Sequence, residues 1–237
     1  MKYMNEPHNF GEYLCYIKDT YPNSPWIQYE SDNYSLKKLY SCIYDSLLIN
    51  EVFSDNCNLK GHSRFLNDFH NYFQSILIAF PVNHQGFISY LIRTSTESFL
   101  KYIFSICYTD FSEEEVARTG FRHLKKDLKD FFKGQSTHNE IVQLLKIYGE
   151  FSKNIHAHVT EYFNSQGTLD YYSNNISTFF LEIIDVCDEL IKLTVKIKCV
   201  LANFNFEDLN HSTRVRLSRR IDKERLSLLV ENKVIKS

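Results

Sequence analysis

The chain has 237 residues with 27 Lys+Arg, 29 Asp+Glu and a net charge of −2, which excludes a protein that binds nucleic acid through overall positive charge. Hydrophobic residues make up 43% and charged residues 24%, which excludes a largely disordered chain. Only 7 Gly and 4 Pro interrupt a sequence that contains 19 Phe and 16 Tyr. Scarce turn-forming residues predict few turns and long elements around a core rich in aromatic rings.

In the first half of the chain, apolar residues recur three and four positions apart, which is the pattern of amphipathic helices. The spacing predicts a short helix over Phe10–Asp19, helices from Ser35 through Leu48 and over Ser63–Phe80, a loop at Asp55–Gly61, and a third long helix over Gln85–Cys107. Pro81 is expected to end the second of the long helices, because proline cannot continue the hydrogen-bond ladder.

The second half continues the same pattern. Ser112 and Glu115 have the spacing of a capping box, which predicts a helix that begins there and ends near Phe132. The next helix carries apolar residues over 141–151; Gly149 and Ser152 leave a break open, and the pattern resumes at Ile155. The longest element runs from about residue 173 to 202 and is apolar on two faces.

These patterns contain no alternating run typical of a strand and no Asn-Gly or Asp-Gly hairpin. We therefore expect an all-α fold, an antiparallel helical bundle with one long central helix that is packed from two sides. The expected organisation is an N-terminal helical region over 1–83, a helical core over 84–204 and a basic C-terminal helical tail over 205–237.

The cellular compartment is predicted from two features, the polar N-terminus and the spacing of the cysteines. The first residues carry no apolar signal segment, and no stretch reaches 18 apolar residues without charges, so we expect a cytoplasmic protein without a membrane span. The 6 cysteines form no C-x-x-C pair and mostly sit in apolar helical patterns, which favours reduced thiols.

Familiar ligand motifs are absent from the sequence. It has no glycine-rich phosphate loop of either common spacing, no H-E-x-x-H and no His/Cys group with zinc spacing. The sequence therefore predicts neither a metal site nor a cofactor.

One short segment carries chemistry, Lys153-Asn154-Ile155-His156-Ala157-His158. It resembles the signature of the HEPN family of helical bundles, which is an arginine, a polar residue, about three further residues and a histidine often preceded by alanine. Lys153 stands where the family has arginine. The helix with Arg93, Glu97 and Lys101 spaced four apart resembles an early helix of the same family, so the resemblance covers roughly residues 84–202.

The resemblance implies an RNA-cleaving or RNA-binding protein of a prokaryotic toxin–antitoxin or antiviral defence system. In HEPN ribonucleases the motifs of two protomers face each other in a dimer cleft and cut RNA without metal. His158 would then be the acid/base group, Lys153 the phosphate contact and Asn154 the residue that orients the histidine, with Arg93 and Glu97 near them. Histidine suits this role because its pKa lies close to neutral pH.

Three interpretations of this segment stay open: an active site, an inactive module that kept the fold, and a surface lysine with two histidines on a helix edge. Arg93, Glu97 and Lys101 also have the spacing of an exposed ion-pair ladder worth about 0.3–0.5 kcal/mol a pair. Two other Arg-to-His spacings, Arg64 to His70 and Arg118 to His123, lack both the polar residue after the arginine and the alanine before the histidine.

The C-terminal stretch is basic and interleaved with leucine and isoleucine. Its arginines, including Arg214, Arg216, Arg219 and Arg220, predict either an exposed amphipathic helix or a segment that contacts RNA or a protein partner. The competing class of function is therefore a catalytically inactive helical subunit that binds protein partners in a defence complex.

Overall fold

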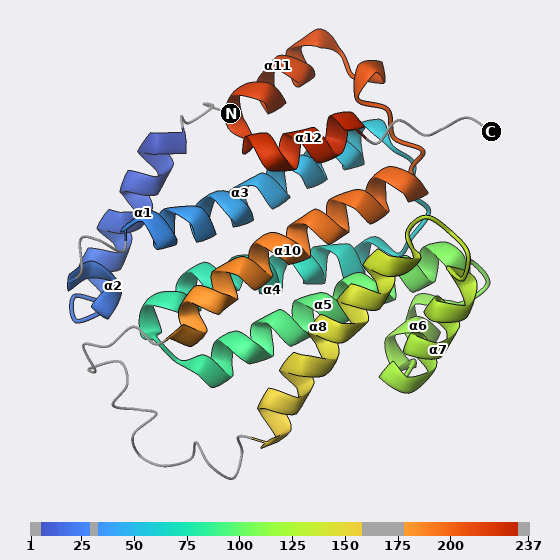
Figure 1. The fold of residues 1–237 in the computed structure, drawn as a ribbon, viewed down its shortest axis with the longest axis horizontal. Coiled ribbons are helices and arrows are strands. Elements are labelled where there is room, and N and C mark those ends of the chain that lie inside the picture. Colours follow the sequence, from blue (N-terminus) through green and yellow to red (C-terminus); the bar gives the residue numbers. More distant parts are fainter. Residues whose placement is uncertain (1–5, 29–32, 158–177, 232–237) are drawn as a thin grey trace.

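The computed structural model describes residues 6–28, 33–157 and 178–231, and every regular element in those residues is helical (Figure 1). This confirms the predicted all-α fold. The elements, in chain order, are α1 (Glu6–Thr20), α2 (Pro25–Gln28), α3 (Asn33–Asn56), α4 (Ser63–Ala79), the 3-10 turn η2 (Phe80–Val82), α5 (Gln85–Cys107), α6 (Glu113–Arg118), α7 (Phe121–Phe131), α8 (His138–Ala157), α10 (Thr178–Leu201), the 3-10 turn η4 (Phe206–Asp208), α11 (His211–Arg220) and α12 (Lys223–Glu231).

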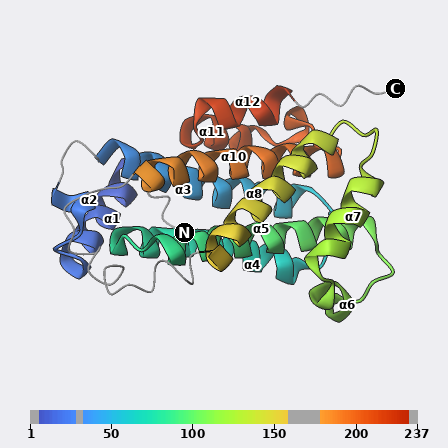
Figure 2. The same ribbon diagram turned by 60° about the horizontal axis from the view of Figure 1, so that its bottom comes forward.

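The long helices α3, α4, α5, α8 and α10 lie alongside one another and form the body of the bundle (Figures 1 and 2). The helix α10 contacts α3, α5, α8 and α12, so it is covered on more than one face. Figure 2 shows α11 and α12 lying over α3 and α10, on the side away from α4 and α5. The short helices α6 and α7 pack against α5 at one end of the bundle.

A tight turn makes α4 and α5 neighbours. Pro81 sits at the start of η2, and Asn83 follows with φ at 57°, in the left-handed region that asparagine tolerates better than most residues. His84 then caps α5, where its ring nitrogen accepts a hydrogen bond from the amide of Phe87 at 3.0 Å. The turn reverses the chain, and α5 packs along α4 over the following residues.

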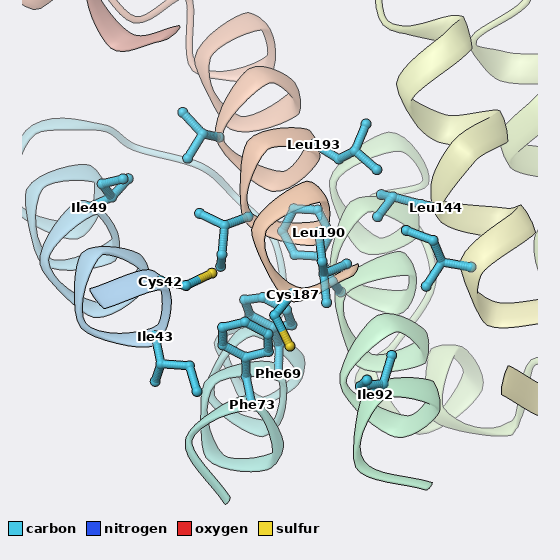
Figure 3. Close-up of a cluster of buried hydrophobic side chains, with 14 of the residues drawn as sticks. Cys42, Ile43, Ile49, Phe69, Phe73, Ile92, Leu144, Cys187, Leu190 and Leu193 are labelled. Atoms are coloured by element: carbon cyan, nitrogen blue, oxygen red, sulfur yellow. The ribbon is translucent and has the colours of Figure 1, made fainter. Parts of the chain in front are cut away.

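The core is one continuous cluster of buried apolar side chains. Figure 3 shows Cys42 of α3, Phe73 of α4, Ile92 of α5, Leu144 of α8 and Leu190 of α10 meeting between the helices. The cluster extends from Phe10 in α1 to Leu229 in α12, so the three segments expected over 1–83, 84–204 and 205–237 share it. All 6 cysteines fall within the described residues and carry free thiols.

Several helix boundaries differ from the sequence prediction. The helix expected from Ser112 to near Phe132 is two helices, α6 and α7, because the chain leaves helical geometry at Thr119 and Gly120. The break left open at Gly149 and Ser152 does not occur, since α8 runs through both residues. The loop after α1 contains the four-residue helix α2, and α3 continues through residue 56 into the predicted loop.

Candidate functional site

A row of three charged residues lies along one edge of α5. The carboxylate of Glu97 is 3.6 Å from the Arg93 guanidinium and 3.1 Å from the Lys101 ammonium. These side chains keep only 26%, 24% and 15% of their area exposed for Arg93, Glu97 and Lys101, respectively. The row is therefore half-buried, and the interpretation as a fully solvated ladder does not describe it.

Lys101 fixes the far end of this row. Its ammonium donates a hydrogen bond of 2.9 Å to the carbonyl oxygen of Ala117, in the last turn of α6. This carbonyl is one of the acceptors that a helix leaves unpaired at its C-terminus, and a lysine satisfies it well. Lys101 thus ties α5 to α6, and the Glu97 carboxylate is shared between the Lys101 ammonium and the Arg93 guanidinium.

Arg93 joins α5 to α8. Its Nε donates to Ser152 Oγ and its Nη2 donates to Tyr148 Oη, both at 3.1 Å. Tyr148 and Ser152 are four residues apart on α8 and therefore present their side chains on the same face. The guanidinium carbon also lies 5.3 Å from the centroid of the Tyr148 ring. Arg93 is held by the two hydrogen bonds that it donates to α8 and by one carboxylate of its own helix.

The ring of Tyr148 is itself fixed by α7. Phe121, the first residue of α7, stacks on Tyr148 with ring centroids 3.7 Å apart and planes inclined by 24°. Helices α5, α7 and α8 thus meet at Tyr148, through Arg93 on one side and Phe121 on the other. A cation held by neighbours in this way is pre-oriented, which lowers the entropic cost of binding an anion. We refer to Arg93, Glu97, Tyr148 and Ser152 as the α5–α8 seam.

The predicted phosphate contact, Lys153, directly follows the seam. Its side chain is exposed on α8, one residue after the serine that Arg93 contacts. Ser152 lies inside α8 and does not cap a new helix, so Lys153 is not in a first helical turn with free backbone amides. Asn154 lies on α8 with its side chain outside the described part, and His158 falls outside the described residues altogether.

The resemblance implies that Arg93 and Glu97 lie near the Lys153 segment, and Arg93 contacts Ser152, the residue before Lys153. The sequence did not identify Tyr148, Ser152 or Phe121 as members of the site. The four-residue spacing of Tyr148 and Ser152 was the available signal. It shows that the two share a helix face, but not that this face meets Arg93.

Most of the C-terminal arginines that were predicted to contact RNA or a partner instead contact other residues of the same chain. Arg214 pairs with Glu207, Arg216 lies 3.1 Å from Glu51, and Arg220 donates to the hydroxyl of Tyr44 at 2.9 Å. Arg219 is exposed. The stretch is thus built into α11 and α12 and packed on the bundle, with less free positive charge than its composition suggests.

The two other Arg-to-His spacings do not form sites. His70 is buried at 6% exposure, and Arg64 lies 3.3 Å from Glu113 and 3.8 Å from Asp68. Arg118 and His123 are exposed on separate helices, α6 and α7, with the break at Gly120 between them. Neither spacing places an arginine and a histidine on the same helix face in an open cleft.

Within residues 6–28, 33–157 and 178–231, no group of three or more His, Cys, Asp or Glu is arranged to hold a metal ion. Among the helices of those same residues, none has both the length and the apolar composition that a membrane crossing requires. Comparison of the chain with models of protein families, with curated proteins and with solved structures gives no match.

Proposed function

We propose that the chain is an HEPN-like endoribonuclease that cuts RNA without a metal ion and acts in a prokaryotic defence or toxin–antitoxin system. The observation that carries the proposal is the hydrogen bond between Arg93 and Ser152. It joins the charged row of α5 to the part of α8 that bears Lys153, as the resemblance implies. The biological setting rests on that resemblance alone.

In this proposal the residues share the work of an internal transfer at phosphorus. The RNA 2′-hydroxyl attacks the neighbouring phosphate, a base takes the proton, and an acid protonates the departing 5′-oxygen. His158 serves as the proton-transfer group because imidazole titrates near neutral pH. Lys153 places positive charge on the scissile phosphate, and Asn154 orients the histidine. Arg93, held by Glu97 and α8, adds a guanidinium whose fork suits phosphate oxygens.

The Lys153 substitution affects how the phosphate is held. A lysine offers a point charge, whereas an arginine offers two parallel donors in a fixed plane. Arg93 donates to Ser152, the residue that precedes Lys153 on α8, so the seam brings a guanidinium to the same turn of that helix. The proposal thus assigns to Arg93 part of the role that the family gives to the arginine of the motif.

An RNA cleavage assay in excess EDTA tests the proposal. The purified wild-type protein is expected to cut RNA, and His158→Ala is expected to abolish cutting. His123→Ala is the matched control, since it removes an exposed histidine from α7 and should cut like the wild type. Intact RNA with the wild type, or equal cutting by His158→Ala, would contradict the proposal.

A second candidate function is an inactive helical subunit that binds a protein partner. The observation that favours it is a pair of aromatic residues on the first turns of α5, Phe87 and Tyr90, which are 44% and 43% exposed. Exposed rings of this size are enriched where proteins meet. The test is the toxicity or the antiviral protection that the protein gives to cells. If this candidate holds, the Phe87→Ser, Tyr90→Ser double variant loses that activity, while His158→Ala keeps it.

A further inference from the structure

A pocket lies away from the α5–α8 seam, between the end of α3, the start of α4, α5 and the last turns of α10. Its volume is about 210 Å³, which suits a ligand of a few heavy atoms. Its polar lining residues are Asn50, Ser54, Cys57, Ser63, Tyr102 and Lys198, and apolar side chains complete the wall. Gly61 closes one wall, where a Cβ atom would come within 2.6 Å of the Tyr102 ring.

The lysine in this pocket has an unusual environment. Lys198 is 4% exposed, its Nζ donates to Asn50 Oδ1 at 2.9 Å, and the rings of Phe53 and Phe99 lie 5.9 and 5.8 Å from it. No carboxylate of the described residues pairs with it within 4.0 Å. Burial lowers the pKa of Lys198 to about 7, so a large share of the side chain is a neutral amine near neutral pH.

The other reactive groups of the pocket keep their protons. Burial raises the pKa of the Cys57 thiol, so this thiol does not compete as a thiolate. Burial, with the nearby Cys57, raises the pKa of Tyr102 to about 12, so its hydroxyl remains a proton donor. The pocket therefore combines one nucleophilic nitrogen with a weak acid that can assist a leaving hydroxyl.

The charge balance decides which ligand the pocket suits. A phosphate or carboxylate would enter beside Phe53, Leu59 and Leu66 with Lys198 as the only cation among the residues that line the pocket. Burying an ion there is costly unless it is fully paired. A neutral carbonyl compound carries no such cost, and its carbon is the electrophile that a neutral amine attacks.

We propose that Lys198 captures a small aldehyde or ketone in this pocket as an imine. The Nζ lone pair attacks the carbonyl carbon, the carbonyl electron pair moves to oxygen, and a proton passes from nitrogen to that oxygen. The resulting carbinolamine loses its hydroxyl and the second nitrogen proton as water, which leaves a C=N bond. No oxidant or reductant takes part, and the capture does not depend on RNA cleavage.

Reductive trapping tests the assignment on the folded wild-type protein. The protein is treated briefly at pH 7.5 with propanal and sodium cyanoborohydride, digested, and mapped by mass spectrometry. Lys198 is expected to acquire the propyl group at least ~10-fold faster than Lys192, because a lysine with a lowered pKa is the activated amine. Lys192 is the matched control on the same helix, paired with Asp188 at 2.8 Å and Glu224 at 2.7 Å.

Two further measurements complete the test. The preference for Lys198 should disappear in 8 M urea, where the pocket no longer exists, and Lys198→Met should fold and leave the remaining lysine labels unchanged. Labelling of Lys198 no faster than of Lys192 in the folded protein would overturn the proposal. A preference for Lys198 over Lys192 that is as large in urea as in the folded protein would overturn it as well, since the pocket would then have no part in the reactivity.

Discussion

Among single residues, His70 shows how burial alone changes side-chain chemistry. It lies on α4 at 6% exposure, its ring contacts that of Phe69 with centroids 4.8 Å apart, and neither ring nitrogen has a hydrogen-bond partner among the described residues. Burial, helped by the charge of Lys198, lowers the pKa of His70 to about 3. The folded protein therefore keeps this ring neutral at a pH where the unfolded chain protonates it.

The consequence is a loss of stability in acid. Between pH 6.5 and pH 3 the unfolded state binds a proton at His70 that the folded state does not, so the free energy of unfolding falls as the pH falls. We expect His70→Leu to lose less stability from pH 7 to pH 4 than the wild type, by about 3 kcal/mol. Urea unfolding at both pH values measures this difference.

His123→Gln serves as the control for this experiment, because His123 is exposed and its replacement should leave the pH dependence as it is in the wild type. Parallel pH dependence of wild type and His70→Leu would show that the buried ring does not resist protonation. The comparison uses differences between variants, so the titration of the carboxylates cancels.

At the scale of a single helix, α8 shows that glycine does not have to break a helix. Gly149 lies inside α8, and a Cβ atom built on it would have open space around it. We expect Gly149→Ala to raise the free energy of unfolding by about 0.5–1 kcal/mol, because alanine loses less backbone entropy on folding. Thermal or urea unfolding measures the gain.

Gly61→Ala is the contrasting variant. Its Cβ atom would come within 2.6 Å of Tyr102 Cε2 and 2.8 Å of Ile106 Cγ1, so we expect a loss of roughly 1–3 kcal/mol from overpacking. Destabilisation by Gly149→Ala of the size expected for Gly61→Ala would mean that α8 does not run through residue 149 in solution.

The sequence predicted those features of the fold that depend on neighbouring residues, and it missed those that depend on contacts between distant residues. The bounds of α5 and the capping box of Ser112 were predicted correctly, since both depend on residues within a few positions of each other. The four-residue helix α2 is too short to show periodicity. The end of α6 before Gly120 was missed because the apolar spacing continues on both sides of this glycine. The α5–α8 seam depends on packing between residues more than 50 positions apart, which periodicity does not encode.

At the scale of the whole molecule, buried charges attach the C-terminal segment to the bundle. Arg225 of α12 is 4% exposed, its Nε donates to Asp45 of α3 at 2.7 Å, and it also pairs with Asp188 of α10. The amide of Asp222 donates to the same Asp45 carboxylate at 3.0 Å. The segment that composition marked as a basic tail is thus part of the fold.

We expect Arg225→Met to lower the free energy of unfolding by about 3–5 kcal/mol, because the buried carboxylate of Asp45 would lose its guanidinium partner and Asp188 would keep only Lys192. Arg219→Met is the matched control, exposed on α11, and should change stability by less than about 0.5 kcal/mol. Equal stability of the two variants, measured by urea unfolding, would contradict the attachment. Because Arg225 holds α12 on the bundle, a deletion of residues 214–225 would disturb the fold. Single substitutions of exposed residues such as Arg219 are therefore the suitable test of RNA or partner binding by this stretch.

The proposed ribonuclease site is tested most directly by the rate of RNA cleavage in EDTA across substitutions of Lys153. Lys153→Arg should preserve or raise the rate, and Lys153→Ala should lower it about 10–100-fold, or about 1.4–2.7 kcal/mol in transition-state stabilisation. Lys146→Ala, an exposed lysine two turns earlier on α8, should cut at the wild-type rate. Cleavage by Lys153→Ala at the wild-type rate would contradict the site, because the lysine that follows the Arg93–Ser152 contact would then take no part in the reaction.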